Sequence, residues 1–338
     1  MTTVSPEFIL ALRDAQVIAP ELPQADAFDT LAWLEAYERS IVVPPGNKVG
    51  KLVLADYRVG TATKPDELAV YVGGVARTDE ELADSRLTSG STLLSADHAT
   101  DPYKISEEPH HYISADHGTG GLARLLSQDQ AVTSIVPLGR QTWNAAVAPD
   151  THPIKEAMGR LFPGKLGFIS LHGMYSGKLF DLSDDTEIHA LVGLGPTPNE
   201  QSRQVAEHIV QAAADLDLKV RIGNDEKYKL YNPITGGYKL DPETGKEREG
   251  QLMAKSPKMT TNFAHRLMAE TQVQVPSIQL ELARVLRLIP SDLDGGWHRD
   301  RHGNRHGDRM AKAMGVHLGY LLAVEAVKAI EGGRSAGN

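Results

Sequence analysis

From about residue 66 onward, short apolar runs alternate with longer segments in which apolar residues recur every three or four positions. The short runs have the length of buried strands, and the longer segments have the period of amphipathic helices. The predicted strands are 68–72, 91–95, 132–137, 166–171, 188–194, 218–222 and 277–282, and another is predicted before them at 51–55. The predicted helices are 78–84, 118–127, 153–161, 199–215, 259–270 and 308–330. This order predicts an α/β fold with a mostly parallel or mixed central sheet and helices on both faces.

Two stretches do not follow this alternation. Residues 1–48 predict two helices, at 6–16 and 25–37, that end before a Pro-Pro-Gly sequence, so we expect an N-terminal helical cap or extension. Residues 224–256 are polar and rich in glycine, which predicts a long loop that is either a lid or disordered. The remaining chain, 49–338, is expected to be a single α/β domain that carries this loop.

The amino-acid composition excludes several kinds of site and partner. The chain has 338 residues, of which 41% are hydrophobic, and it has no cysteine, so disulfides, thiolate metal sites and cysteine nucleophiles are excluded. A formal charge of −9 argues against a nucleic-acid partner. No segment reaches the roughly 20 apolar residues of a membrane span, so we expect a cytoplasmic protein without a membrane partner. A homo-oligomer is left open.

Three of the predicted strands lead to residues that can bind a metal or move a proton. His98 follows strand 91–95, His172 follows strand 166–171, and Glu281 lies in strand 277–282. Ligands of such sheets lie beyond the carboxyl ends of the strands. Asp116 precedes a glycine-rich helix start, where it is either an N-cap or a third ligand. Two histidines and one carboxylate would leave zinc an open position for water, although a single histidine at a strand end can equally be structural.

Glu281 needs a partner because an unpaired carboxylate in an apolar strand costs several kcal/mol. One interpretation is an ion pair with Arg284 or Arg287. The other is a general base whose pKa is raised by burial.

Two further stretches each allow two interpretations. The histidine- and arginine-rich segment 297–306 predicts a solvated loop, or else a metal or phosphate site. Segment 231–238 predicts a turn-rich loop, or else a lid whose Asn232 and Tyr238 contact substrate.

Six motifs occur in the order found in the N-formylglutamate amidohydrolase family, and residues 90–290 therefore resemble that family. The motifs are Ser95-Ala-Asp-His98-Ala-Thr, Ser114-Ala-Asp116-His-Gly-Thr-Gly-Gly-Leu-Ala, His152-Pro-Ile-Lys-Glu-Ala-Met, Ile169-Ser-Leu-His172-Gly-Met, Asn232-Pro-Ile-Thr-Gly-Gly-Tyr238 and Ile278-Gln-Leu-Glu281-Leu-Ala-Arg284. The resemblance implies a fold like that of the zinc carboxypeptidases and other phosphorylase/hydrolase-like proteins.

The resemblance also implies roles for individual residues. His98 and His172 would be zinc ligands, Asp116 would stand at the place of the acidic ligand, and Glu281 would be the catalytic carboxylate. Arg140 resembles an arginine that faces the scissile carbonyl. The expected substrate contacts are Asn144, Asn232, Tyr238 and Arg284.

This sequence departs from the family pattern in three places. Asp97 precedes His98 where proline is usual, and Asp116 stands where glutamate is frequent. An insertion at 105–111 brings further candidate ligands, so another residue could replace Asp116. These alternatives are Glu107, Glu108, His110, His111 and His117.

The sequence therefore predicts a zinc-dependent enzyme that hydrolyses an amide bond in a small N-acyl amino acid or a short peptide-like substrate. Two other functions stay open at this point. Two histidines and a carboxylate also form the iron site of non-haem oxygenases, and the same fold could serve as a metal-free binding module.

Overall fold

The computed structural model describes most of the chain from residue 66 onward. The described residues are 66–99, 116, 119–129, 132–138, 141, 148–174, 178–181, 187–195, 197–223, 227–232, 237–238, 240, 243–246, 249–251, 260–283, 286–287 and 305–333. The predicted helices at 6–16 and 25–37, the wider segment 1–48 and the predicted strand 51–55 lie outside these residues.

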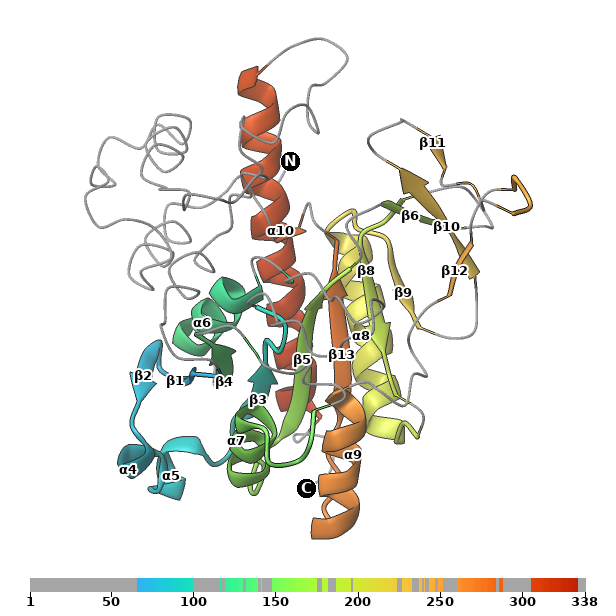
Figure 1. The fold of residues 1–338 in the computed structure, drawn as a ribbon. Coiled ribbons are helices and arrows are strands. Elements are labelled where there is room, and N and C mark those ends of the chain that lie inside the picture. Colours follow the sequence, from blue (N-terminus) through green and yellow to red (C-terminus); the bar gives the residue numbers. More distant parts are fainter. Residues whose placement is uncertain are drawn as a thin grey trace.

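An eight-stranded mixed sheet forms the centre of the protein (Figure 1). Its strands are β1 (Leu68–Val72), β2 (Val75–Arg77), β3 (Thr92–Ser95), β4 (Val132–Pro137), β5 (Gly167–Gly173), β8 (Ala190–Gly193), β9 (Val220–Ile222) and β13 (Ser277–Leu282). The strand order is β2-β1-β4-β3-β5-β13-β8-β9. The four central strands β4, β3, β5 and β13 are parallel, whereas β1 and β8 flank them in the antiparallel sense. The predicted mixed α/β class is confirmed.

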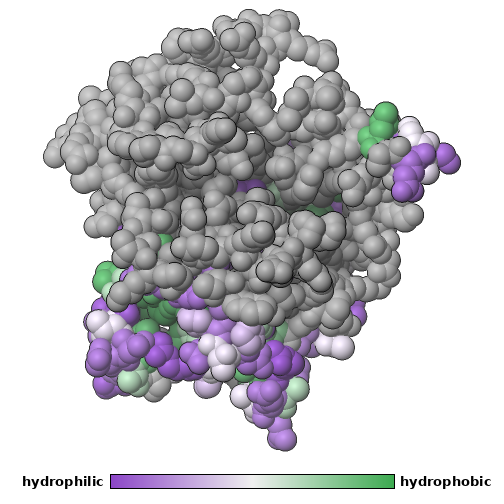
Figure 2. All heavy atoms as spheres, viewed as in Figure 1, coloured by the Kyte–Doolittle hydropathy of each residue, from purple (hydrophilic) through white to green (hydrophobic). Residues whose placement is uncertain are grey.

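Helices cover both faces of this sheet. On one face lie α6 (Thr119–Asp129), α8 (Glu200–Asp215) and α10 (Arg305–Gly332), and on the other lie α7 (Pro153–Leu161) and α9 (Thr260–Thr271). Two short helices, α4 (Asp79–Leu82) and α5 (Ser85–Thr88), precede β3. Hydrophilic residues prevail on the described surface over α4, α5 and α9 (Figure 2).

The double covering explains why the central strands carry apolar residues on both of their faces. Leu93 packs in the core shared with α7 and α9, while its neighbour Leu94 packs in the core shared with α6, α8 and α10. Both side chains are fully buried. Because successive side chains of a strand point to opposite faces, a sheet covered on both sides buries both sets of side chains.

Local signals fix the starts of two helices near the sheet. The side chain of Asn199 accepts a hydrogen bond from the backbone N–H of Ser202 and so caps α8. Pro153 opens α7 at a position where its missing N–H costs nothing, with His152 as the N-cap residue. These boundaries agree with the predicted helices.

The segment 224–256 contains strands, which corrects the prediction of one long loop. β10 (Lys227–Asn232), β11 (Gly237–Tyr238) and β12 (Glu249–Gln251) pair antiparallel, and they join β6 (Lys178–Asp181) and β7 (Glu187–Ile188) in a second, five-stranded sheet. Its sequence 227–231, Lys-Tyr-Lys-Leu-Tyr, does carry β-forming residues. The lysines and the flanking polar residues hid this signal, because a strand of a small peripheral sheet need not be apolar on both faces.

The single strand predicted over 188–194 is two strands. β7 belongs to the small sheet and β8 to the central one, with His189 between them. The backbone N–H of Lys219 donates to Nδ1 of His189, which fixes the chain where it passes from one sheet to the other. Among the described helices, none combines the length and apolarity that a membrane crossing requires.

Candidate metal centre

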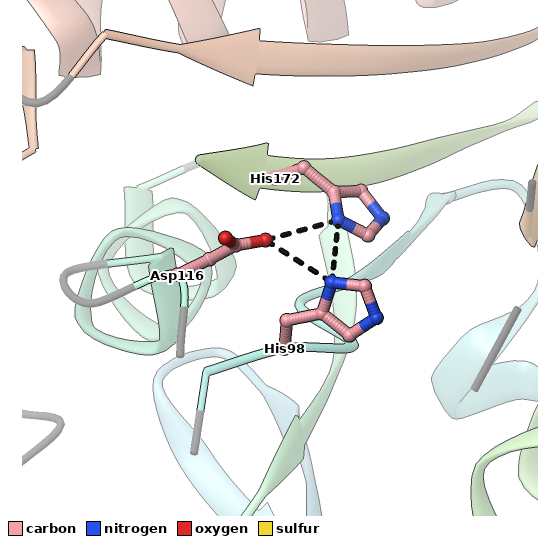
Figure 3. A group of neighbouring side chains, drawn as sticks. All are labelled: His98, Asp116 and His172. Carbon is pink, nitrogen blue, oxygen red and sulfur yellow. Dashed lines mark hydrogen bonds and ion pairs between the residues drawn. The ribbon is translucent and has the colours of Figure 1, made fainter. Parts of the chain in front are cut away.

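Three separate segments converge at the carboxyl end of the central strands (Figure 3). His172 is the sixth residue of β5, His98 follows β3, and Asp116 precedes α6. The backbone N–H of Asp116 donates to the carbonyl oxygen of His98 at 2.7 Å, so two of the three segments are joined directly. The sheet therefore places His172, and a backbone hydrogen bond joins the segments of His98 and Asp116 to each other.

The three ligand atoms form a compact triangle. Nδ1 of His172 lies 3.0 Å from Oδ2 of Asp116 and 3.1 Å from Nδ1 of His98, and the third side, from His98 to Asp116, measures 3.3 Å. Ligands about 2.0–2.1 Å from a tetrahedral zinc ion are separated by roughly 3.3 Å, so the triangle has nearly the size of one face of that tetrahedron. These residues could hold a metal ion.

The charges of the cluster act strongly on one another. Burial alone would lower the pKa of His172, but hydrogen bonds and the charges of Asp116 and Asp97 outweigh it and raise the pKa to about 10. Burial would raise the pKa of Asp116, yet the two histidines hold it well below its usual range. The cluster thus attracts positive charge, either as a proton on an imidazole or as a cation among the three atoms.

Glu281 lies beside this triangle. In the parallel pairing of β5 with β13, Glu281 stands opposite His172 and Gln279 stands opposite Ser170. The amide of Gln279 donates to the carboxylate of Glu281 at 2.7 Å. Burial raises the pKa of Glu281 above its usual value, although the charge of His172 opposes the shift. A carboxylate that is oriented by an amide and has a raised pKa has the properties of a general base.

A row of polar side chains crosses the sheet next to the triangle, and we call it the polar row. Its members are Ser95, Asp97, Ser170, His172, Gln279 and Glu281. Its members on β3, β5 and β13 lie on the face that carries α7 and α9, since they alternate with residues of the opposite core. The sequence interpretation missed Asp97, Ser170 and Gln279. Their signal was the spacing of two residues from His172 or Glu281, or the adjacency to His98, which looks like an ordinary polar position in a single sequence.

Among the described residues, Arg287 donates hydrogen bonds to backbone carbonyl oxygens and not to Glu281, so the alternative of an ion pair between these two residues is not supported. Arg287 donates from Nε to the carbonyl oxygen of Leu282 at 3.2 Å and from its guanidinium to that of Met174 at 3.3 Å. It thereby joins the segments that follow β5 and β13. Arg284, the other proposed partner, lies outside the described residues.

The structure describes only some of the remaining predicted site residues. Arg140 and Asn144 lie outside the described residues, as do the alternative ligands at 107–111 and His117. Asn232 and Tyr238 lie in β10 and β11, where Asn232 pairs with Gly237 and Tyr238 with Tyr231. β6 follows β5 after residues 174–177, which brings the small sheet to the carboxyl side of the central strands (Figure 1). The histidine- and arginine-rich stretch 297–306 overlaps the described residues only where α10 begins.

No family model matches the chain, and no curated protein matches it. Solved structures with a similar arrangement include the gene product Atu2144 from Agrobacterium tumefaciens, with 13% identity over 77% of this chain and 94% of that chain and a TM-score of 0.34. A bacteriophage poly-gamma-glutamate hydrolase has 11% identity over 86% of this chain and 95% of its own, with a TM-score of 0.34. A purine nucleoside phosphorylase from Toxoplasma gondii has 9% identity over 71% and 93%, with a TM-score of 0.28. With likenesses this low, the function has to be argued from the site.

Proposed function

We propose that this protein is a zinc-dependent amidohydrolase that acts on a small N-acyl amino acid or a short peptide-like amide. The observation that carries the proposal is the triangle of His98, Asp116 and His172 with Glu281 beside it. Two imidazoles and one carboxylate are donors that zinc accepts, and three protein ligands leave a fourth position open. The order of motifs in the sequence supports the same reaction.

Zinc bound there would polarise the substrate carbonyl and lower the pKa of a water molecule towards about 7. Glu281 would accept the proton of the attacking water and transfer it to the leaving nitrogen. Gln279 holds the carboxylate of Glu281 by one oxygen, which leaves the other oxygen for this proton. Arg140, Asn144, Asn232, Tyr238 and Arg284 are proposed substrate contacts on the resemblance of the sequence alone.

The test combines metal analysis with a substrate screen. Purified protein should contain zinc in a ratio near one per chain, and removing it with a chelator should abolish hydrolysis of N-acyl amino acids or dipeptides until zinc is restored. His98→Ala should lose the metal. Stoichiometric iron with oxygen-dependent turnover would instead favour the oxygenase, and unchanged function in His98→Ala would favour a metal-free module.

A further inference from the structure

The imidazole of His172 has partners on both sides of the ring. Nδ1 faces His98 and Asp116, whereas Nε2 points back into the protein, 2.8 Å from Oγ of Ser170. Oγ of Ser170 in turn lies 3.3 Å from Oδ2 of Asp97, and that carboxylate oxygen is itself 3.7 Å from Nε2 of His172. A chain of polar atoms therefore runs from the candidate metal position through His172 and Ser170 to Asp97.

The direction of each hydrogen bond follows from what the end group can do. An ionised carboxylate only accepts, so the hydroxyl proton of Ser170 is donated to Asp97. The oxygen of Ser170 is then free to accept from Nε2–H of His172. With its proton on Nε2, the neutral ring presents the lone pair of Nδ1 to the triangle, which is the form that binds a metal. This tautomer is assigned from the hydrogen-bond network.

Asp97 is held as an internal anion. Its side chain is 1% exposed, and its other oxygen accepts a hydrogen bond from Ser95. The charge of Asp97 also acts on Lys155 near the start of α7, where it opposes the lowering of the lysine pKa that burial causes. Hydrogen bonds in such a dry environment are electrostatically stronger than in water, so the chain of bonds constrains the ring.

The connectivity Ser170–His172–Asp116 is also that of a serine-hydrolase triad, which gives Ser170 a second interpretation as a nucleophile. Two observations oppose this interpretation. The side chain of Ser170 is 0% exposed, and its hydroxyl is already directed at Asp97. A nucleophile has to reach a substrate carbonyl, so the hydroxyl of Ser170 is placed to hold the ring.

We propose that Asp97, acting through Ser170, is a positioning residue that fixes the tautomer and orientation of His172 for metal binding. The inference rests on the proposed metal site and adds the residues that prepare it. Outer partners of a ligating histidine typically contribute about 10- to 100-fold to metal affinity. Neither Asp97 nor Ser170 would touch substrate.

Metal affinity of the full chain tests the inference without any substrate. Zn²⁺ is titrated against a competing chelating dye for wild type, Ser170→Ala, Asp97→Asn and the double variant, and Co²⁺ absorption reports the ligand geometry. Both single variants should bind Zn²⁺ about 10- to 100-fold more weakly. Because both substitutions interrupt the same chain of hydrogen bonds, the double variant should bind Zn²⁺ only a little more weakly than the single variant that loses more affinity.

Ser277→Ala is the matched control. It also removes a fully buried hydroxyl, but at the amino-terminal end of β13, and should change Zn²⁺ affinity less than about 3-fold. If Asp97→Asn does not fold, the comparison of Ser170→Ala with Ser277→Ala still decides the question.

The outcomes separate two kinds of failure. Wild-type protein that binds no Zn²⁺ would remove the metal site and this inference with it. Wild-type affinity in Ser170→Ala, or losses that add in full in the double variant, would overturn the inference and leave the metal site standing. Lost turnover with unchanged metal affinity in Ser170→Ala would overturn it in favour of a nucleophile.

Discussion

The two ends of the central parallel strands each bury a polar cluster, but the clusters are built in opposite ways. At the amino end, Nζ of Lys165 donates to the carbonyl oxygen of Thr88 and to the hydroxyls of Ser91 and Thr133, at 2.6–2.8 Å. Each of its three protons has an acceptor. At the carboxyl end, two imidazole nitrogens and a carboxylate oxygen point at one another. The first cluster pairs each of its donors with an acceptor, whereas the second brings together three side-chain atoms that can all serve as metal ligands.

The contrast shows how to distinguish a structural polar cluster from a binding site in a protein of unknown function. Burial does not distinguish them, because Lys165 and His172 are both buried. The balance of donors and acceptors does. Where buried donors and acceptors match, the cluster stabilises the fold, and where acceptors converge without donors, a cation is expected.

The largest expected effect concerns Glu281. Glu281→Gln keeps the shape of the side chain but removes its ability to accept a proton, so turnover should fall about 10²- to 10⁴-fold while bound zinc stays unchanged. Steady-state kinetics and metal analysis on the same preparation measure both. Glu270→Gln, the same exchange at an exposed position of α9, is the control. Near wild-type turnover in Glu281→Gln would remove this residue from the mechanism.

Metal addition tests whether the cluster of His98, Asp116 and His172 takes up a cation. Zinc that binds only the folded protein should raise the free energy of unfolding by about 2.7 kcal/mol when free zinc is about 100-fold above its Kd. Chemical denaturation with zinc and with a chelator measures the difference. The gain should vanish in His98→Ala and persist in Lys165→Met, and an equal gain in His98→Ala would locate the zinc elsewhere.

Arg287 is the buried cation that the carboxyl end does possess, and Gly173 makes room for it. A Cβ at position 173 would lie 2.3 Å from the guanidinium carbon of Arg287. Gly173→Ala should therefore displace Arg287 from the carbonyl oxygens of Met174 and Leu282 and cost about 1–3 kcal/mol of the free energy of unfolding. Urea denaturation measures it. Gly332→Ala, where nothing lies within 4 Å of the added carbon, should be close to neutral.

The last effect is a pH dependence at the amino end. Burial lowers the pKa of Lys165 from 10.5 to about 7 in the folded protein. Between these values the unfolded chain binds a proton that the folded protein does not, so the free energy of unfolding rises with pH, by at most about 1.4 kcal/mol per pH unit. Below about pH 7 both states are protonated and this contribution is constant.

Denaturation curves of wild type and Lys165→Met between about pH 6 and pH 9.5 isolate this contribution, because other titrating groups are common to both proteins. The difference between the two should change with pH in that window. A constant difference would show that Lys165 keeps its proton throughout this range.

The sequence predicted most of the central sheet because its strands are covered on both faces. Runs such as 91–95 and 132–137 are short and contain no charged residue, and the flanking helices have a clear period. The same physics made His98, His172 and Glu281 conspicuous, since each interrupts or ends an apolar run. Where a strand is polar, as at 227–232, that contrast is missing and the prediction failed.

The partners of these residues could not be predicted from one sequence. Ser170 acts on His172 from two residues away and Gln279 on Glu281 at the same spacing, but an interval of two says only that both side chains share a face. Asp97 contacts Ser170 across two strands, which requires the order of strands in the sheet. The sequence therefore indicated the candidate ligands, and only the fold indicated what holds them.

The backbone hydrogen bond between His98 and Asp116 has a consequence for the segment 99–115 that it encloses. Because this hydrogen bond already brings His98 and Asp116 together, the entropy of closing the loop between them is lost on folding and not on metal binding. That cost grows by about 0.6 kcal/mol for each doubling of length. Binding of a metal to these two residues would therefore not have to supply that entropy.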